Sequence, residues 1–161
     1  MIAALLATAS MTLASAENAG SGNEGRAIQS IRMLTLEDAQ VLANAAQARA
    51  AQDDWTVAIA VVDAGGHLLV FRRMDGTQIG SSEIAIRKAE SAFLFKRPTK
   101  DLEDLIARDG LAHVMTLQNV TAVEGGLPII HGGQVIGAIG ISGVTAAQDG
   151  IIAAAGVDAL E

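Results

Sequence analysis

Residues 132–143 read GGQVIGAIGISG, and five of these twelve residues are glycine. The part QVIGAIGIS has the apolar alternation of a buried strand. The tetrapeptide HGGQ before it predicts a tight turn, with LPIIH at 127–131 as the other strand of a hairpin. Glycine inside a strand usually marks the close approach of another backbone or of a flat ligand. Gly137 and Gly140 therefore predict contact with a helix, a neighbouring subunit or a ligand.

The glycine spacing argues against the two common nucleotide-binding loops. A dinucleotide-binding loop lies between a strand and a helix and needs an acidic residue at the end of the next parallel strand. Here Gly137 and Gly140 lie inside the strand, and the sequence pattern after it predicts a helix and no further strand. A Walker loop ends in Gly-Lys-Ser or Gly-Lys-Thr, but no lysine follows Lys100.

The rest of the sequence predicts an α+β domain. Thr35 is a good N-cap for an amphipathic helix over 36–52. Strand patterns at 55–63 and 68–73 flank the turn AGGH and predict a second hairpin. The remaining predicted elements follow in chain order: a helix capped by Ser81 or Ser82 that ends before Pro98, a short helix over 100–108, a strand within 114–124, and a final helix capped by Thr145. This order predicts an antiparallel sheet covered by helices.

The composition limits both the core and the partners. The chain has 161 residues, enough for one domain, and half of them are hydrophobic. Only four are aromatic, so the core must consist of Ala, Val, Ile and Leu in thin, closely packed layers. The net charge is −7 and there is no basic run, so nucleic acid is not an expected partner. The absence of cysteine excludes disulfides, thiolate metal sites and a cysteine nucleophile.

The N-terminal residues predict export. Residues 1–16, MIAALLATASMTLASA, carry no charge and end in the small residues that signal peptidase accepts. We therefore expect a signal peptide, a flexible lead-in over 17–33 and a domain over 34–161, in a periplasmic or secreted protein. The first segment lacks a basic start, so a disordered tail on a cytoplasmic protein is the alternative. It is too short to span a bilayer as a helix, and no membrane span is expected in the mature form.

Few residues suggest chemistry directly. The three histidines, His67, His113 and His131, show no metal-cluster spacing, and the first and last are also typical of solvated turns. A single imidazole is nevertheless enough for a haem iron. Ser142 lacks a Gly-x-Ser-x-Gly elbow and is better explained as a helix-entry residue. Lys88, in an otherwise apolar helix, suggests snorkelling or a surface salt bridge, with a role in catalysis as the alternative.

Four segments together resemble one known family: IAVVDAGGHLLVFRRMDGT, SSEIAIRKAESAF, GGLPIIHGGQVIGAIGISG and QDGIIAAAG. They are similar to the GlcG/HbpS-like proteins, also called the haem-degrading domain family, which includes the C-terminal domain of PduO-type proteins. The resemblance extends from about Leu34 to Leu160. The residues that match the family motifs are Asp63, Gly65, Gly66, Arg73, Met74, Asp75, Gly76, Lys88, Gly126, Pro128, Gly137, Gly140, Ser142, Gly143 and Asp149.

The resemblance implies a five-stranded antiparallel sheet flanked by helices, related to profilin-like folds, and homo-oligomers such as dimers or octamers. Some members bind or degrade haem, or sense haem and redox state outside the cytoplasm. Others are encoded with glycolate or diol metabolism and have no settled activity. The family motifs do not specify one histidine as the haem ligand.

We therefore expect an exported, oligomeric haem-binding protein, with catalysis left open. The expected ligand contacts come from the glycine-rich strand, one loop and one helix: Arg73, Met74, Asp75, Lys88, Gly137 and Gly140. Lys88 or Arg73 would meet a haem carboxylate. The candidate iron ligands are His67, His113 and His131, with Met74 as a weaker candidate. Two other interpretations stay open: a non-haem accessory protein that binds small organic acids, and a structural oligomeric scaffold.

Overall fold

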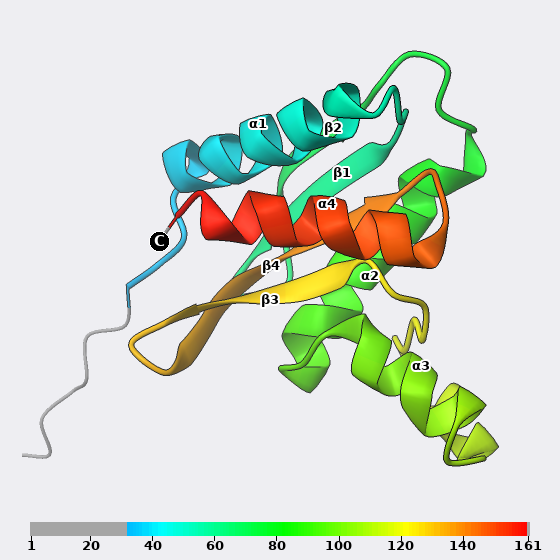
Figure 1. The fold of residues 1–161 in the computed structure, drawn as a ribbon. Helices are drawn as coiled ribbons and strands as arrows, with labels where there is room; N and C mark the ends of the chain where they lie inside the picture. The colour runs from blue at the N-terminus through cyan, green and yellow to red at the C-terminus, as the bar shows by residue number, and fades with distance from the viewer. Residues whose placement is uncertain (1–31, 161) are drawn as a thin grey trace, which may run out of the picture.

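The computed structural model describes residues 32–160, so the predicted signal peptide and nearly all of the lead-in lie outside the described residues. The elements in chain order are α1 (Leu36–Gln52), β1 (Ala58–Asp63), β2 (Leu68–Arg73), α2 (Gly80–Phe95), α3 (Thr99–Ala107), a short 3₁₀ helix η1 (Ala112–Thr116), β3 (Gly126–His131), β4 (Gln134–Ser142) and α4 (Ala146–Asp158) (Figure 1). None of the helices in this range is long and apolar enough to cross a membrane.

The strands form one antiparallel sheet in the order β2-β1-β4-β3. Two hairpins, β1–β2 and β3–β4, meet through the pairing of β1 with β4 at the centre. The turn of the second hairpin is Gly132-Gly133, with φ of 57° and 76°. Positive φ at both central residues gives the backbone twist that a two-residue hairpin needs, and glycine adopts it without strain. The predicted α+β class and both hairpins are confirmed.

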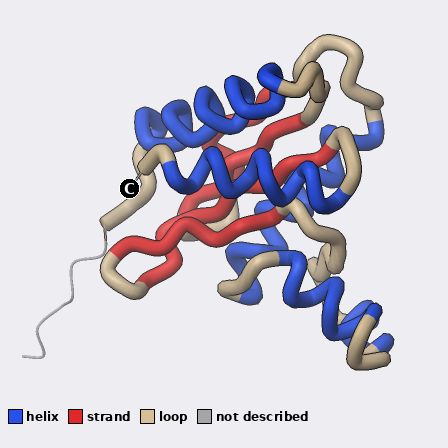
Figure 2. Tube along the Cα trace, in the orientation of Figure 1, coloured by secondary structure: helices blue, strands red, loops and turns tan. Residues whose placement is uncertain are grey.

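The described sheet has four strands, so the prediction of five is wrong. The segment 114–124, expected as a strand, instead begins within η1 and continues as an irregular loop (Figure 2). The backbone N–H of Thr121 donates to Ser91 Oγ at 3.1 Å, and that of Glu124 donates to Glu103 Oε2 at 2.8 Å. Because these partners are side chains of α2 and α3, the two N–H groups form no ladder with a neighbouring strand.

Helices cover the two faces of the sheet unequally. On one face α1 and α4 lie side by side over an aliphatic core, with Leu42, Ile59, Ile139, Ile141 and Ile152 fully buried. On the other face α2 packs through alanines, which meet the alanines of β1 and β4: Ala85, Ala89 and Ala92 against Ala58, Ala60 and Ala138. Methyl side chains on both sides let α2 lie close to the sheet, and the expected thin Ala-Val-Ile-Leu core is confirmed.

The helix N-termini show where local sequence decides the boundary. Thr35 and Thr145 each form a capping box, so both predicted N-caps are confirmed. At α2 the prediction is wrong, because the helix begins at Gly80 with Ile79 as its N-cap and no side-chain cap bond. Ser81 instead faces the protein interior and is fully buried.

Candidate functional site

The glycine-rich strand is covered by the chain itself. A Cβ on Gly140 would lie 2.1 Å from the carbonyl oxygen of Ala85 on α2. A Cβ on Gly137 would lie 2.5 Å from the carbonyl oxygen of Val62 and 2.8 Å from the side chain of Leu34. Both glycines thus accommodate backbone and core atoms of the chain. The sequence predicted that a helix, a neighbouring subunit or a ligand would contact Gly140. In the structure this contact is made by the helix α2.

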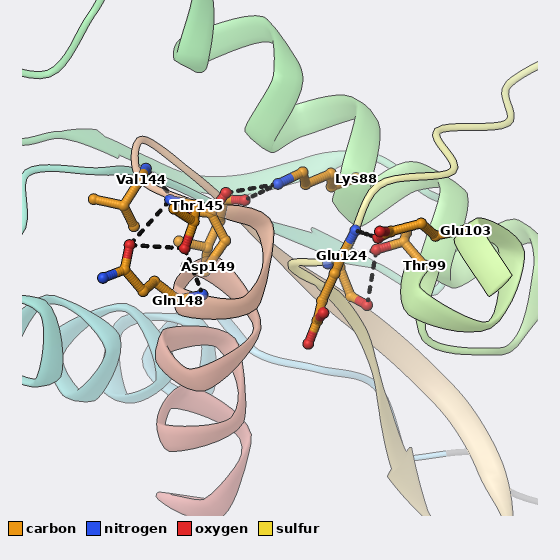
Figure 3. A network of polar contacts seen from close by, with 10 residues as sticks. Lys88, Thr99, Glu103, Glu124, Val144, Thr145, Gln148 and Asp149 are labelled. Carbon is orange, nitrogen blue, oxygen red and sulfur yellow. Dashed lines mark hydrogen bonds and ion pairs between the residues drawn. The ribbon is translucent and has the colours of Figure 1, made fainter. Parts of the chain in front are cut away.

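Lys88 and Asp149 form an ion pair in the interior. Lys88 Nζ lies 2.8 Å from Asp149 Oδ2 and 2.9 Å from the carbonyl oxygen of Ile141, and the two side chains are 1% and 3% exposed (Figure 3). Asp149 Oδ1 also accepts a bond from the backbone N–H of Val144 at 3.2 Å. The interpretation of Lys88 as a snorkelling or surface residue is therefore wrong, because its ammonium reaches an acidic partner on a helix from the opposite face of the sheet.

This pair links the two helical layers at the end of β4. Burial raises the pKa of Asp149 above its ordinary value, while Lys88 and the Val144 N–H act in the opposite direction. A Cβ on Gly125 would lie 2.8 Å from Lys88 Nζ, and the φ of this glycine is 126°. The backbone therefore closes tightly over the pair, and Lys88 is placed to hold α2 and α4 together rather than to face solvent.

The loop after β2 lies at the same end of the sheet as the end of β4. In the register of the sheet, Ala58 pairs with Arg73 on one side and with Ser142 on the other. Arg73, Met74 and Asp75 line an open depression of about 600 Å³ together with Gln47 and Arg72. The three predicted loop residues are thus brought together.

Two of the three histidines lie at the opposite end of the sheet. His67 precedes β2 and His131 ends β3, and these are the two outer strands. Three interstrand spacings of about 4.8 Å separate outer strands of a four-stranded sheet, so the two imidazoles do not share a site. His113 lies on η1, and all three histidines are exposed. His67 and His131 therefore lie far from the loop that contains Arg73. The residues expected to form one ligand site are split between the two ends of the sheet.

A groove brings His131 together with a cation and apolar walls. It has a volume of about 340 Å³ between the β3–β4 hairpin and the end of α4. Its apolar lining includes Ile130, Ile136, Val157 and Leu160. Arg32 also lines it and donates to Asp38 Oδ1 at 3.1 Å, with about half of its side chain exposed. The groove therefore offers one imidazole and one guanidinium above an aliphatic surface.

Sequence reasoning missed Arg32, because it falls in the predicted lead-in. The capping box of α1 could have indicated it. The Asp38 carboxylate, at the third helical position, accepts the Thr35 N–H and so lies close to the residues that precede Thr35. An arginine three residues before the cap is within reach of that carboxylate. Sequence also gave no indication of the Glu103 and Ser91 bonds that fix the 117–125 loop.

A family model described as "Haem degrading protein HbpS-like" matches residues 34–158. The chain belongs to the HbpS-like family. Among its relatives, protein GlcG of Escherichia coli K12 is 39% identical over 110 residues, which cover 68% of this chain and 81% of GlcG. The crystal structure of HbpS aligns with a TM-score of 0.77 at 33% identity, over 85% of this chain and 96% of that one. The crystal structure of a PduOC:heme complex aligns with a TM-score of 0.73 at 33% identity, over 80% of this chain and 95% of that one.

In this HbpS-like chain, several residues that match the family motifs serve the fold. Lys88 and Asp149 join the helical layers, and Gly140 admits α2. Asp63 Oδ1 accepts the backbone N–H groups of Gly65 and His67 at 2.8 and 2.9 Å, which fixes the first hairpin turn. The groove beside His131, by contrast, lies at the surface of the single chain, where His131 is exposed.

Proposed function

We propose that the chain binds haem in the groove beside His131. The observation that carries the proposal is the juxtaposition of an exposed imidazole, the Arg32 guanidinium and aliphatic walls in one groove. Membership of the HbpS-like family and the similarity to the PduOC:heme complex support the same ligand.

The residues present fit the chemistry of the group. Haem has a flat apolar ring, two carboxylates and an iron that accepts an imidazole nitrogen. His131 would ligate the iron, Arg32 would meet a carboxylate, and Ile130, Ile136, Val157 and Leu160 would cover part of the ring. Bound haem supplies redox chemistry at its iron. The chain supplies a ligand, a compensating charge and an apolar surface.

Export, homo-oligomerisation as a dimer or octamer, and haem degradation or sensing belong to the same proposal. Each has its support in the sequence: the apolar segment 1–16 for export, and the family resemblance for assembly and for the chemistry. Arg73, Met74 and Asp75 lie at the other end of the sheet. A role for them in the same haem site therefore requires a second copy of the chain.

The test is a titration of the purified full chain with hemin, followed by the Soret band. The wild-type chain is expected to give a saturable shift at micromolar hemin. His131→Ala is expected to weaken binding at least tenfold, whereas the matched variants His67→Ala and His113→Ala keep the wild-type titration. Loss of the shift in one of those two variants, with His131→Ala unchanged, would move the ligand elsewhere. The absence of any shift in the wild type would exclude haem binding.

A further inference from the structure

A second pocket lies between α2, α3 and the loop that follows η1. Its volume is about 420 Å³, within the usual range for small-molecule sites. Most of the lining is aliphatic, including Ile84, Ile106, Val120 and Val123. Arg87 and Glu103 supply charged groups. The pocket shares no lining residue with the groove beside His131.

A polar hollow adjoins the apolar one. It has a volume of about 390 Å³ and is lined by Arg87, Glu90, Asn119, Val120 and Thr121. Arg87, Val120 and Thr121 line both hollows, so Arg87 lies where the apolar hollow meets the polar one. A ligand that occupies both must have an apolar body and a polar end in the hollow that Arg87 and Glu90 line.

The loop that forms one wall is held in place by side chains of α2 and α3. Ser91 Oγ, which is fully buried, accepts the Thr121 N–H, and Glu103 accepts the Glu124 N–H (Figure 3 shows the second bond). Further along, Thr99 Oγ1 accepts the Gly126 N–H at 2.9 Å. The wall is therefore formed before any ligand arrives, which lowers the entropy cost of binding.

The charges in the pocket select the polar end of the ligand. One oxygen of Glu103 is engaged by the Glu124 N–H, which reduces its capacity to attract a cation. Among the described residues, Arg87 is paired only with Glu83 on its own helix, and both side chains are about two-thirds exposed. Because an exposed i,i+4 pair contributes little, Arg87 can exchange this partner for a ligand carboxylate at small cost.

We propose that this pocket binds an amphipathic monocarboxylate, with its aliphatic tail among Ile84, Ile106 and Val123 and its carboxylate on Arg87. The site is separate from the haem groove and does not depend on it. Removing the guanidinium should act on the head group of the ligand and leave the tail contribution intact. That difference separates a ligand contact from a structural role of Arg87.

The experiment titrates the haem-free full chain with three probes, hexanoate, hexanamide and acetate, followed by the NMR amide signals of Thr121 and Val123. Hexanoate should bind about tenfold or more tightly than hexanamide, since only hexanoate forms a charge-assisted bond, and acetate should not saturate. Arg87→Gln should reduce hexanoate affinity to that of hexanamide and leave hexanamide unchanged. Arg108→Gln, at the C-cap of α3, is the matched control and should leave both affinities unchanged. His131→Ala should also bind hexanoate with the wild-type affinity.

Other outcomes would overturn the proposal. If hexylammonium binds and hexanoate does not, a carboxylate of the lining, Glu103 or Glu90, is the anchor and the ligand class is wrong. If no probe shifts these signals, the pocket does not bind the proposed class. If Ile106→Ala dissociates an assembly seen by sedimentation while no probe binds, the surface belongs to a contact with a second copy of the chain.

Discussion

Replacing Lys88 with methionine removes the positive partner of a carboxylate that is 3% exposed. Asp149 then keeps the Val144 N–H, and the carbonyl oxygen of Ile141 loses its side-chain donor. Breaking a buried pair from one side costs about 3–5 kcal/mol of unfolding free energy. At about 2–4 °C of melting temperature per kcal/mol for a protein of this size, Lys88→Met should melt about 6–20 °C below the wild type.

The matched double variant separates the charge from the packing. Lys88→Met with Asp149→Leu leaves no uncompensated charge and should recover most of the loss, because an apolar pair of similar volume is often as stable as the ion pair. The assay is urea unfolding of four proteins: the wild type, Lys88→Met, Asp149→Leu and the double variant. If the double variant is as unstable as the sum of the two single variants, the pair is not coupled and the assignment of Lys88 as a link between α2 and α4 is refuted.

The pH dependence has a definite sign. Burial raises the pKa of Asp149 in the folded state above the ordinary 3.8, so the folded state holds this proton more firmly than the unfolded state. Its contribution to stability therefore falls as pH rises from about 3.8 through the raised pKa. Without the Lys88 ammonium, which lowers the pKa of Asp149, that pKa rises further. The loss of unfolding free energy in Lys88→Met, relative to the wild type, should accordingly be smaller at about pH 5 than at about pH 8. An equal loss at both pH values would contradict a buried, ionised Asp149.

Three further predictions concern the fold. Gly140→Ala should lower the unfolding free energy by about 1–3 kcal/mol, because the new methyl meets the backbone of α2, whereas Gly80→Ala, with no atom within 4 Å, should be neutral or stabilising in the same thermal melt. Thr145→Ala removes a capping box and should cost about 1 kcal/mol in urea unfolding. Burial alone would raise the pKa of Asp63, but the backbone N–H groups of His67 and Gly65 lower it below 3.8. The stabilisation that these bonds give is present above that pH and is lost as pH falls through the folded pKa. Asp63→Asn should therefore be less stable than wild type near neutral pH, and the two stabilities should converge in acid.

Local patterns predicted most of the fold. Alternation and glycine turns predicted both hairpins, and the threonines before α1 and α4 predicted their N-caps, because each signal depends on residues only a few positions apart. The strand expected within 114–124 was wrong for the opposite reason. Its backbone partners are Ser91 and Glu103, which are about 20 to 30 residues away in sequence, and no local pattern indicates them.

The candidate site was harder to predict for the same reason. Lys88 and Asp149 are 61 residues apart, and only the fold shows that they meet in the interior. The sequence alone did not single out one of the three histidines as the haem ligand. The structure distinguishes them because His131, on the β3–β4 hairpin, lines a groove together with Arg32 and the end of α4. These residues come from the beginning and the end of the described chain, so no local pattern could bring them together.

Haem binding beside His131 can be observed in a crystal structure of the full chain with bound hemin. We expect the iron at an imidazole nitrogen of His131, a haem carboxylate at Arg32, and the ring against the aliphatic residues at the end of α4. Iron at His67 or His113, or a ring seated in the pocket between α2 and α3, would contradict it.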